Sequence, residues 1–328
     1  MVSHHRLIRH CEERLSLAPP ARAGVRRSNL ILICALLLFG CSPASHSLTS
    51  VPVTETPQPP DTPTPAPDYI TRIRNAEYQL GLTDALKVVQ LTDGKFEQGI
   101  PSGIDYTSIT MTDFAASGDL DGDGVDEIAA LVAENYGGSG VFVFLAVYKD
   151  VGGMLKFQTS ILVDDRPQLN GLSIENGEVF LNATTHKTDE PFCCPTLETT
   201  RHYLLTQNGQ LDMTDYTTFT PDGRPRTITI ESPVNGAETY SSVRIKGSVD
   251  IAPFENNLTY RIFDVGGVEL AVGAITVDAP NPGAPGTFDE VISLGRILSG
   301  AVIRIEVQDI SAEDSSLFAM DSVELVVK

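Results

Sequence analysis

Seven short β-like runs fill the last hundred or so residues, and they constrain the fold more than any other feature of the chain. Apolar and polar residues alternate in several of them, as in Ile228/Ile230 and Val243/Ile245. A period of two is typical of strands that bury one face. Seven such strands in about 100 residues predict a β-sandwich. The runs cover residues 227–231, 243–249, 258–264, 269–277, 287–294, 301–309 and 321–327.

Residues 227–328 also carry a series of motifs: ITIESPVNG at 228–236, VRIKGS at 243–248, LTYRIFD at 258–264, GTF at 286–288, IEVQD at 305–309 and SAED at 311–314. Together they resemble the bacterial immunoglobulin-like domain found in spore-germination proteins. The resemblance implies a β-sandwich appended to other envelope domains, with no catalytic residues and no necessary role in germination. The chain has no tryptophan, so any likeness to antibody domains is one of architecture.

Residues 68–218 are predicted to form a second, β-rich domain, mainly antiparallel, with a helix at its start as an alternative that would make it α+β. Turn pairs support this: Asp93-Gly94, Asn176-Gly177 and Asn208-Gly209 each stand between β-like runs and predict hairpins. Residues 70–80 fit a short helix or a strand equally well. The segment resembles a domain that recurs in bacterial surface lipoproteins, which implies no particular activity. The predicted fold class is therefore mainly β, with the boundary near residues 220–226.

The sharpest motif is the acidic loop DLDGDGVDE at residues 119–127. Acids at alternate positions of a tight loop direct hard oxygens inward, as Ca²⁺ requires, and Gly124 permits the sharp turn. An EF-hand would need an acid at the twelfth position, where Ala130 stands. The string resembles the calcium loop of FG-GAP repeats, which lies between strands. The resemblance implies that Asp119, Asp121, Asp123 and Glu127 bind Ca²⁺ through their side chains and Val125 through its carbonyl, in a structural role. The alternative is a solvated acidic turn.

The first forty residues predict a signal peptide instead of a folded segment. Two arginines, Arg26 and Arg27, precede an apolar run at residues 30–39 that is too short to span a bilayer. The sequence LFGC at 38–41 resembles the lipobox of bacterial lipoproteins, which implies that Cys41 receives a lipid and becomes the mature N-terminus. An ordinary secretory signal is the alternative. Residues 41–67 are rich in Pro and Thr and predict a semi-rigid linker.

The chain is strongly acidic, with a formal net charge of -20. Residues 1–40 contain six arginines and two glutamates and so contribute +4, which leaves -24 for the chain from Cys41 onward. Such a surface repels phosphate backbones and argues against a nucleic-acid partner.

Cys193 and Cys194 are the only cysteines after Cys41. An oxidising envelope favours a disulfide between them, although neighbouring cysteines strain the backbone. The alternatives are a metal site with His186 and His202, or two buried thiols.

Enzyme signatures are otherwise missing from the sequence: it has no Gly-x-Ser-x-Gly elbow, no phosphate-binding loop and no His-Glu-x-x-His motif. We therefore expect a lipid-anchored protein outside the cytoplasm. It would bind or scaffold an envelope protein or glycan without catalysis and would be stabilised by Ca²⁺. The alternative is an extracytoplasmic hydrolase with its site in residues 68–218, near His186. A cavity joining His186 to a nucleophile would favour that alternative.

Overall fold

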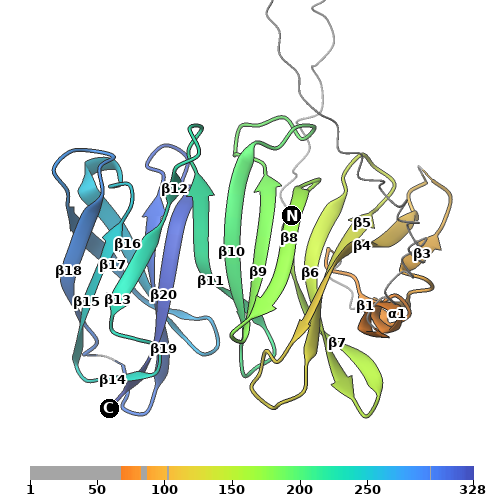
Figure 1. Ribbon diagram of the computed structural model, residues 1–328, viewed down its shortest axis with the longest axis horizontal. Helices are drawn as coiled ribbons and strands as arrows, with labels where there is room; N and C mark the ends of the chain where they lie inside the picture. Colours follow the sequence, from red (N-terminus) through yellow and green to blue (C-terminus); the bar gives the residue numbers. More distant parts are fainter. Residues whose placement is uncertain (1–67, 83–86, 102, 296) are drawn as a thin grey trace, which may run out of the picture. The chain divides into compact units, whose positions relative to one another are not determined.

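The structure is a computed structural model that describes residues 68–82, 87–101, 103–295 and 297–328 (Figure 1). These residues form twenty strands, one short α-helix and one 3₁₀ helix, which confirms the mainly β fold class. The predicted signal peptide (1–40), the linker (41–67) and Cys41 lie outside the described residues.

The first half of the described chain packs two antiparallel sheets against each other. Helix α1 (Asp68–Ile73) and the paired strands β1 (Glu77–Gln79) and β2 (Val88–Gln90) cover the outer face of the first sheet. The strands of that sheet are paired in the order β3-β4-β5-β6-β7. In the second sheet β8, β9, β10 and β11 are paired in that order. Their bounds are β3 Lys95–Gln98, β4 Thr107–Gly118, β5 Glu127–Asn135, β6 Phe142–Val151, β7 Met154–Asp165, β8 Gln168–Glu175, β9 Glu178–Thr185, β10 Leu197–Leu205 and β11 Leu211–Phe219.

Strands β5 and β6 explain why this half contains unbroken apolar runs. Side chains alternate between the two faces of a strand. On β5, Ile128, Ala130 and Val132 pack into the core beneath α1, β1 and β2. Their neighbours Ala129 and Leu131 pack into the core shared with β9–β11. Both faces are therefore dry, and a strand buried on both faces needs an apolar run instead of an alternating one.

The second half is a sandwich, and all seven strands predicted in it are present. They are β13 (Ile228–Ser232), β15 (Ser242–Val249), β16 (Asn257–Asp264), β17 (Glu269–Asp278), β18 (Gly286–Ser293), β19 (Val302–Ile310) and β20 (Leu317–Val327). One layer contains β13, β15 and β18, and the other contains β16, β19 and β20. Strand β17 joins the two layers, because it pairs with β16 along most of its length and with β18 only at its end. A single core lies between them, with Ile245 and Phe288 from one layer and Ile262 and Ile305 from the other. The short elements β12 (Pro225–Arg226), β14 (Ala237–Thr239) and η1 (Phe254–Asn256) were not predicted.

Two of the three predicted hairpins are confirmed. The turn Asn176-Gly177, with φ angles of 52° and 83°, connects β8 to β9, and Asn208-Gly209 connects β10 to β11. The third prediction is wrong. Asp93-Gly94 makes a turn with φ angles of 51° and 77°, closed by the single bridge between Thr92 and Lys95. The strands on either side pair elsewhere, β2 with β1 and β3 with β4.

Strand pairing continues from the first half into the second. β11 pairs with β20 over three residue pairs: Asp215 with Asp321, Tyr216 with Met320 and Thr217 with Ala319. The three cores are nevertheless separate, and the third is built only from residues between 228 and 327. The division into domains at 68–218 and 227–328 stays a prediction, since the described chain forms one unit by its contacts.

Candidate functional site

The acidic loop connects β4 to β5, as the likeness to strand-flanked calcium loops implies. Gly118, the last residue of β4, pairs with Glu127, the first of β5, so the loop closes a hairpin. Gly122 and Gly124 have φ angles of 76° and 83°, which residues with a Cβ rarely adopt. No atom lies within 4 Å of a Cβ placed at either position, so the requirement for glycine is conformational and not steric.

The loop is folded by hydrogen bonds to its own carboxylates. Asp119 Oδ1 accepts the amide N–H of Gly122 at 2.7 Å, and Oδ2 accepts that of Gly124 at 2.9 Å. Asp123 Oδ1 accepts the Val125 N–H at 2.8 Å. Each carboxylate oxygen has more than one acceptor site, so these bonds shape the loop and still leave lone pairs for an ion.

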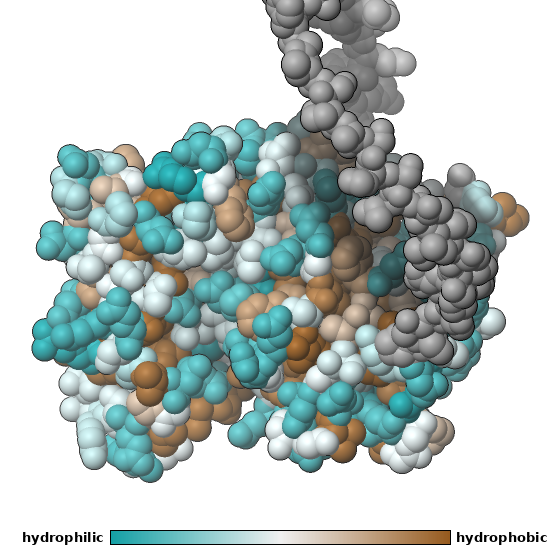
Figure 2. Space-filling model, viewed as in Figure 1, coloured by the Kyte–Doolittle hydropathy of each residue, from teal (hydrophilic) through white to brown (hydrophobic). Residues whose placement is uncertain are grey.

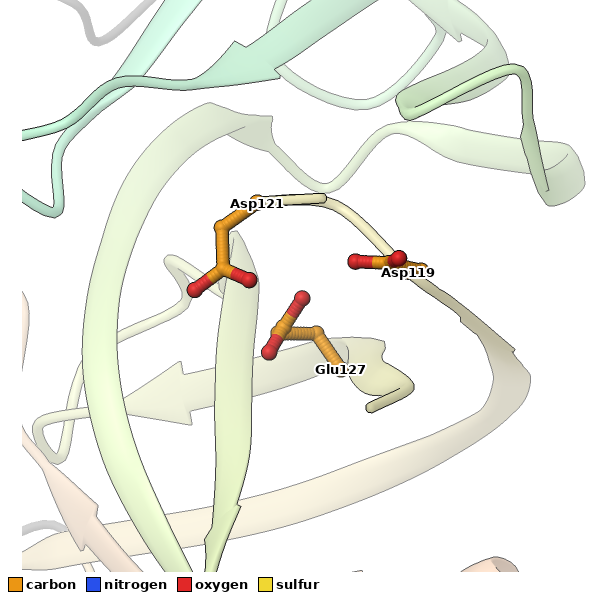
Figure 3. Close-up of side chains that lie close together, drawn as sticks. All are labelled: Asp119, Asp121 and Glu127. Carbon is orange, nitrogen blue, oxygen red and sulfur yellow. The ribbon is translucent and has the colours of Figure 1, made fainter. Parts of the chain in front are cut away.

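Three of the predicted ligands converge (Figure 3). One oxygen from each of Asp119, Asp121 and Glu127 lies within 4.8 Å of the other two. Calcium binds oxygens at about 2.3–2.6 Å, so oxygens that share one ion lie up to about 5 Å apart. The spacing of these three carboxylates therefore fits oxygens that share one calcium ion.

Glu127 shows the fit most clearly, because its side chain is 0% exposed. Its Oε2 accepts the N–H of Leu120 at 2.9 Å. Its Oε1 is buried and has no hydrogen-bond partner among the described residues; the nearest cation is the Lys149 ammonium at 3.5 Å. A buried carboxylate oxygen without a hydrogen bond costs free energy unless a cation compensates it. The carboxyl group of Glu127 lies between those of Asp121 and Asp119 (Figure 3).

The remaining predicted ligands lie at the rim of the loop. Asp123 is outside the converging group, and its Oδ2 lies 2.8 Å from Lys149 Nζ. The hydrogen bond from Lys149 is the largest cause of a lowered pKa of the Asp123 carboxyl. Val125 has an exposed side chain, and its carbonyl stays a predicted ligand. Asp126 accepts a hydrogen bond from Ser117 at 3.1 Å.

Lys149, at the end of β6, is the residue that sequence reasoning missed. Its ammonium bonds Asp121 and lies beside Asp123 and Glu127. Hydrogen bonds to Asp121 and then Asp123 raise the pKa of Lys149 above its usual range. The only signal would have been the sheet register. Ile128 pairs with Tyr148, so Glu127 and Lys149 come next on the two strands.

The cysteine pair lies in the loop between β9 and β10, and both residues are exposed. The alternative of two buried thiols is therefore wrong. The thiols are free, with sulfur atoms 2.7 Å apart, and the disulfide stays a prediction. A cysteine–histidine metal site gains no support, since within the described ranges only Asp119, Asp121 and Glu127 form a group of three or more at metal-binding distance.

His186 forms a pair with a carboxylate instead. Its Nδ1 lies 2.9 Å from Asp164 Oδ2, which also accepts the His186 backbone N–H. The side chain is 7% exposed, its ring lies 5.9 Å from that of Phe192, and Nε2 has no partner among the described residues. Three cavities found among the described residues are lined by residues other than His186. These cavities therefore give no support to a site that joins His186 to a nucleophile, and the hydrolase alternative stays a prediction.

A polar cavity of about 380 Å³ lies where β11 meets β20. His202, Asp215 and Asp321 stand in one row across three adjacent strands, since Asp215 is the register partner of both others. Glu178 and Glu324 also line the cavity. Burial, followed by the charges of Asp321 and Glu178, raises the pKa of Asp215 to about 7. Burial raises that of Asp321 to about 6, and burial lowers that of His202.

These shifts predict a strand junction that weakens as the pH rises. Carboxyl groups have an ordinary pKa near 4 in an unfolded chain, so between about pH 4 and pH 7 the folded state binds more protons. Their stabilising contribution is complete below about pH 4 and is lost as the pH rises through 6 and 7. We expect Asp215→Asn to be more stable than the wild type by about 1–3 kcal/mol at pH 8, with little difference at pH 4. Urea denaturation at both pH values measures this, and a pH-independent difference would contradict it.

No family model matches the sequence, and comparison with curated proteins gives no match either. In the part of the chain that the structure describes, no helix has the length and apolar character needed to span a membrane.

Proposed function

We propose that the protein is a calcium-stabilised cell-envelope lipoprotein whose described part binds or scaffolds another envelope component without catalysis. The observation that carries the proposal is the buried Glu127, whose Oε1 lacks a hydrogen bond and whose carboxylate converges with those of Asp119 and Asp121. Extracellular calcium modules work with dissociation constants of about 10⁻⁴–10⁻³ M. A site of this strength would be filled outside the cell and would serve to hold the β4–β5 hairpin in place.

The N-terminal sequence supports the location. An apolar run, the LFGC sequence and a Pro/Thr-rich linker follow one another at residues 30–67. In this proposal Cys41 carries the lipid, and the linker holds the folded part away from the membrane surface. The likeness of residues 227–328 to an immunoglobulin-like envelope domain supports the same placement.

The surface and the charge of the chain bear on the choice of partner. The face shown in Figure 2 mixes hydrophilic side chains with smaller groups of hydrophobic ones. In this proposal the partner is an envelope protein or glycan and not a nucleic acid, because the chain from Cys41 onward carries a charge of -24. The alternative of a hydrolase lacks a specific observation in its favour, since none of the three described cavities is lined by His186.

Calcium-dependent melting of the full chain tests the proposal. An ion that binds only the folded state stabilises it by RT ln(1 + [L]/Kd), about 1.4–2.7 kcal/mol when Ca²⁺ is in ten- to hundredfold excess over Kd. For a unit of this size the melting temperature should be roughly 3–10 °C higher in 10 mM Ca²⁺ than in EDTA. Magnesium at the same concentration serves as the control for ionic strength. Identical melting curves in EDTA and Ca²⁺ would show that the loop is only an acidic turn.

A further inference from the structure

Lys149 lies where a metal ion would be expected. Its ammonium hydrogen-bonds Asp121, lies 2.8 Å from Asp123 Oδ2 and lies 3.5 Å from Glu127 Oε1. Two of these three acids, Asp121 and Glu127, also belong to the group that fits calcium. The ammonium and a calcium ion would therefore compete for the carboxylates of Asp121 and Glu127.

We propose that Lys149 is an exchangeable counter-ion of the loop: its ammonium holds the acids together without metal, and Ca²⁺ binds by displacing it. This inference rests on the proposed calcium function and adds the residue that sets the affinity of the site. The exchange transfers no proton, because the lysine leaves as an ammonium ion and the carboxylates stay ionised.

Electrostatics favours Ca²⁺ over the Lys149 ammonium as the cation bound by the loop. Five acids lie within residues 119–127, and their repulsion disfavours the closed loop unless a cation is present. The lysine supplies one positive charge and is covalently attached to the chain, so this counter-ion is present at any metal concentration. A divalent ion supplies twice that charge and takes six to eight oxygen ligands, whereas an ammonium offers three donors. Na⁺ and K⁺ bring no additional charge and gain little by displacing the lysine.

The lysine is free to leave. Its side chain is 24% exposed, so one side of it already contacts solvent. A lysine stem has four flexible carbons and a strongly hydrated head, which suits a group that changes its position. The displaced ammonium can therefore move into water while β6 remains paired. Because calcium must replace this ion pair, the affinity of the site is lowered toward the range that extracellular modules use.

Substitution of Lys149 tests the exchange. We expect Lys149→Met in the full chain to bind Ca²⁺ at least tenfold more tightly than the wild type in isothermal titration calorimetry. Lys156→Met is the matched control, because Lys156 is exposed and is the cross-strand partner of Lys149 on β7. It removes the same charge from the same strand pair and should change the Kd by less than twofold. Equal affinities of Lys149→Met and the wild type would overturn the inference and leave the calcium function intact. Absence of binding in both proteins would overturn the calcium function itself.

A second measurement uses only the wild-type protein, so it does not depend on the folding of a variant. An amine-acylating reagent should label Lys149 several-fold faster in 10 mM Ca²⁺ than in EDTA, because the displaced ammonium leaves its three carboxylates. Peptide mass spectrometry reports this, with Lys156 as the internal reference. An unchanged Lys149 rate in protein that calorimetry shows to bind Ca²⁺ would mean that the lysine stays in place, which overturns the exchange.

Discussion

Cys41→Ser should move the protein almost completely from the membrane fraction to the soluble fraction. The thiol of Cys41 is the lipid acceptor that the LFGC sequence implies, and a serine hydroxyl does not replace it. The linker at residues 41–67 is rich in proline and threonine, a composition that is typical of spacers and not of membrane-binding segments. One acyl chain already contributes about 0.8 kcal/mol per buried methylene, and stable anchoring needs more than one chain. Immunoblots of fractions washed without detergent measure the outcome.

Cys34→Ser provides the matched control. Cys34 lies inside the apolar run of the same leader, and its replacement makes the same chemical change seven residues upstream. We expect this variant to remain in the membrane fraction. A Cys41→Ser protein that also stays membrane-bound through the washes would place the anchor elsewhere in the chain.

The strands of the second half could be predicted because their pattern is local. Short β-like runs marked all seven of them, and several of these runs alternate with a period of two, as strands that bury one face do. The polar face of β19 was less predictable. Arg304 and Glu306 would ordinarily lie in solvent, but Arg304 pairs with Asp212 of β11 at 3.0 Å and with Glu306 at 3.1 Å. Only the approach of β11 to β20 buries these charges, and no local pattern encodes that approach.

The candidate site also has one part that local sequence predicts and another part that depends on strand pairing. Its acids and glycines follow one another in nine residues, so spacing alone predicted a tight acidic loop, and the resemblance to a known calcium loop implied its place between strands. Lys149 lies 28 residues beyond Asp121, and its role depends on the register of β5 against β6. The row of His202, Asp215 and Asp321 could not be predicted either, because it is assembled from three strands, one of them more than a hundred residues away.

Glu127→Gln should abolish calcium binding while preserving the fold. The amide oxygen of glutamine can still accept the Leu120 N–H that Glu127 Oε2 accepts at 2.9 Å. The substitution removes the charge of the buried carboxylate, and a hard divalent cation prefers charged oxygens. We expect a loss of at least a hundredfold in affinity and no rise in melting temperature on adding 10 mM Ca²⁺. Circular dichroism would confirm that the variant is folded.

Asp126→Asn controls for the change in charge. Asp126 lies in the same loop, but its carboxylate accepts a hydrogen bond from Ser117 and is outside the converging group. The variant should keep the calcium-dependent rise in melting temperature. A Glu127→Gln protein that responds to calcium as strongly as Asp126→Asn would mean that the buried carboxylate is not a ligand.

The number of calcium ions bound per wild-type chain tests the central claim most directly. Equilibrium dialysis of the full chain against Ca²⁺ from micromolar to 10 mM, at physiological ionic strength, measures both number and affinity. The account predicts one saturable site per chain with a Kd of about 10⁻⁴–10⁻³ M, absent from Glu127→Gln. Binding that rises without saturation, and equally in Glu127→Gln, would reflect only the acidic surface and would contradict a calcium site in the loop.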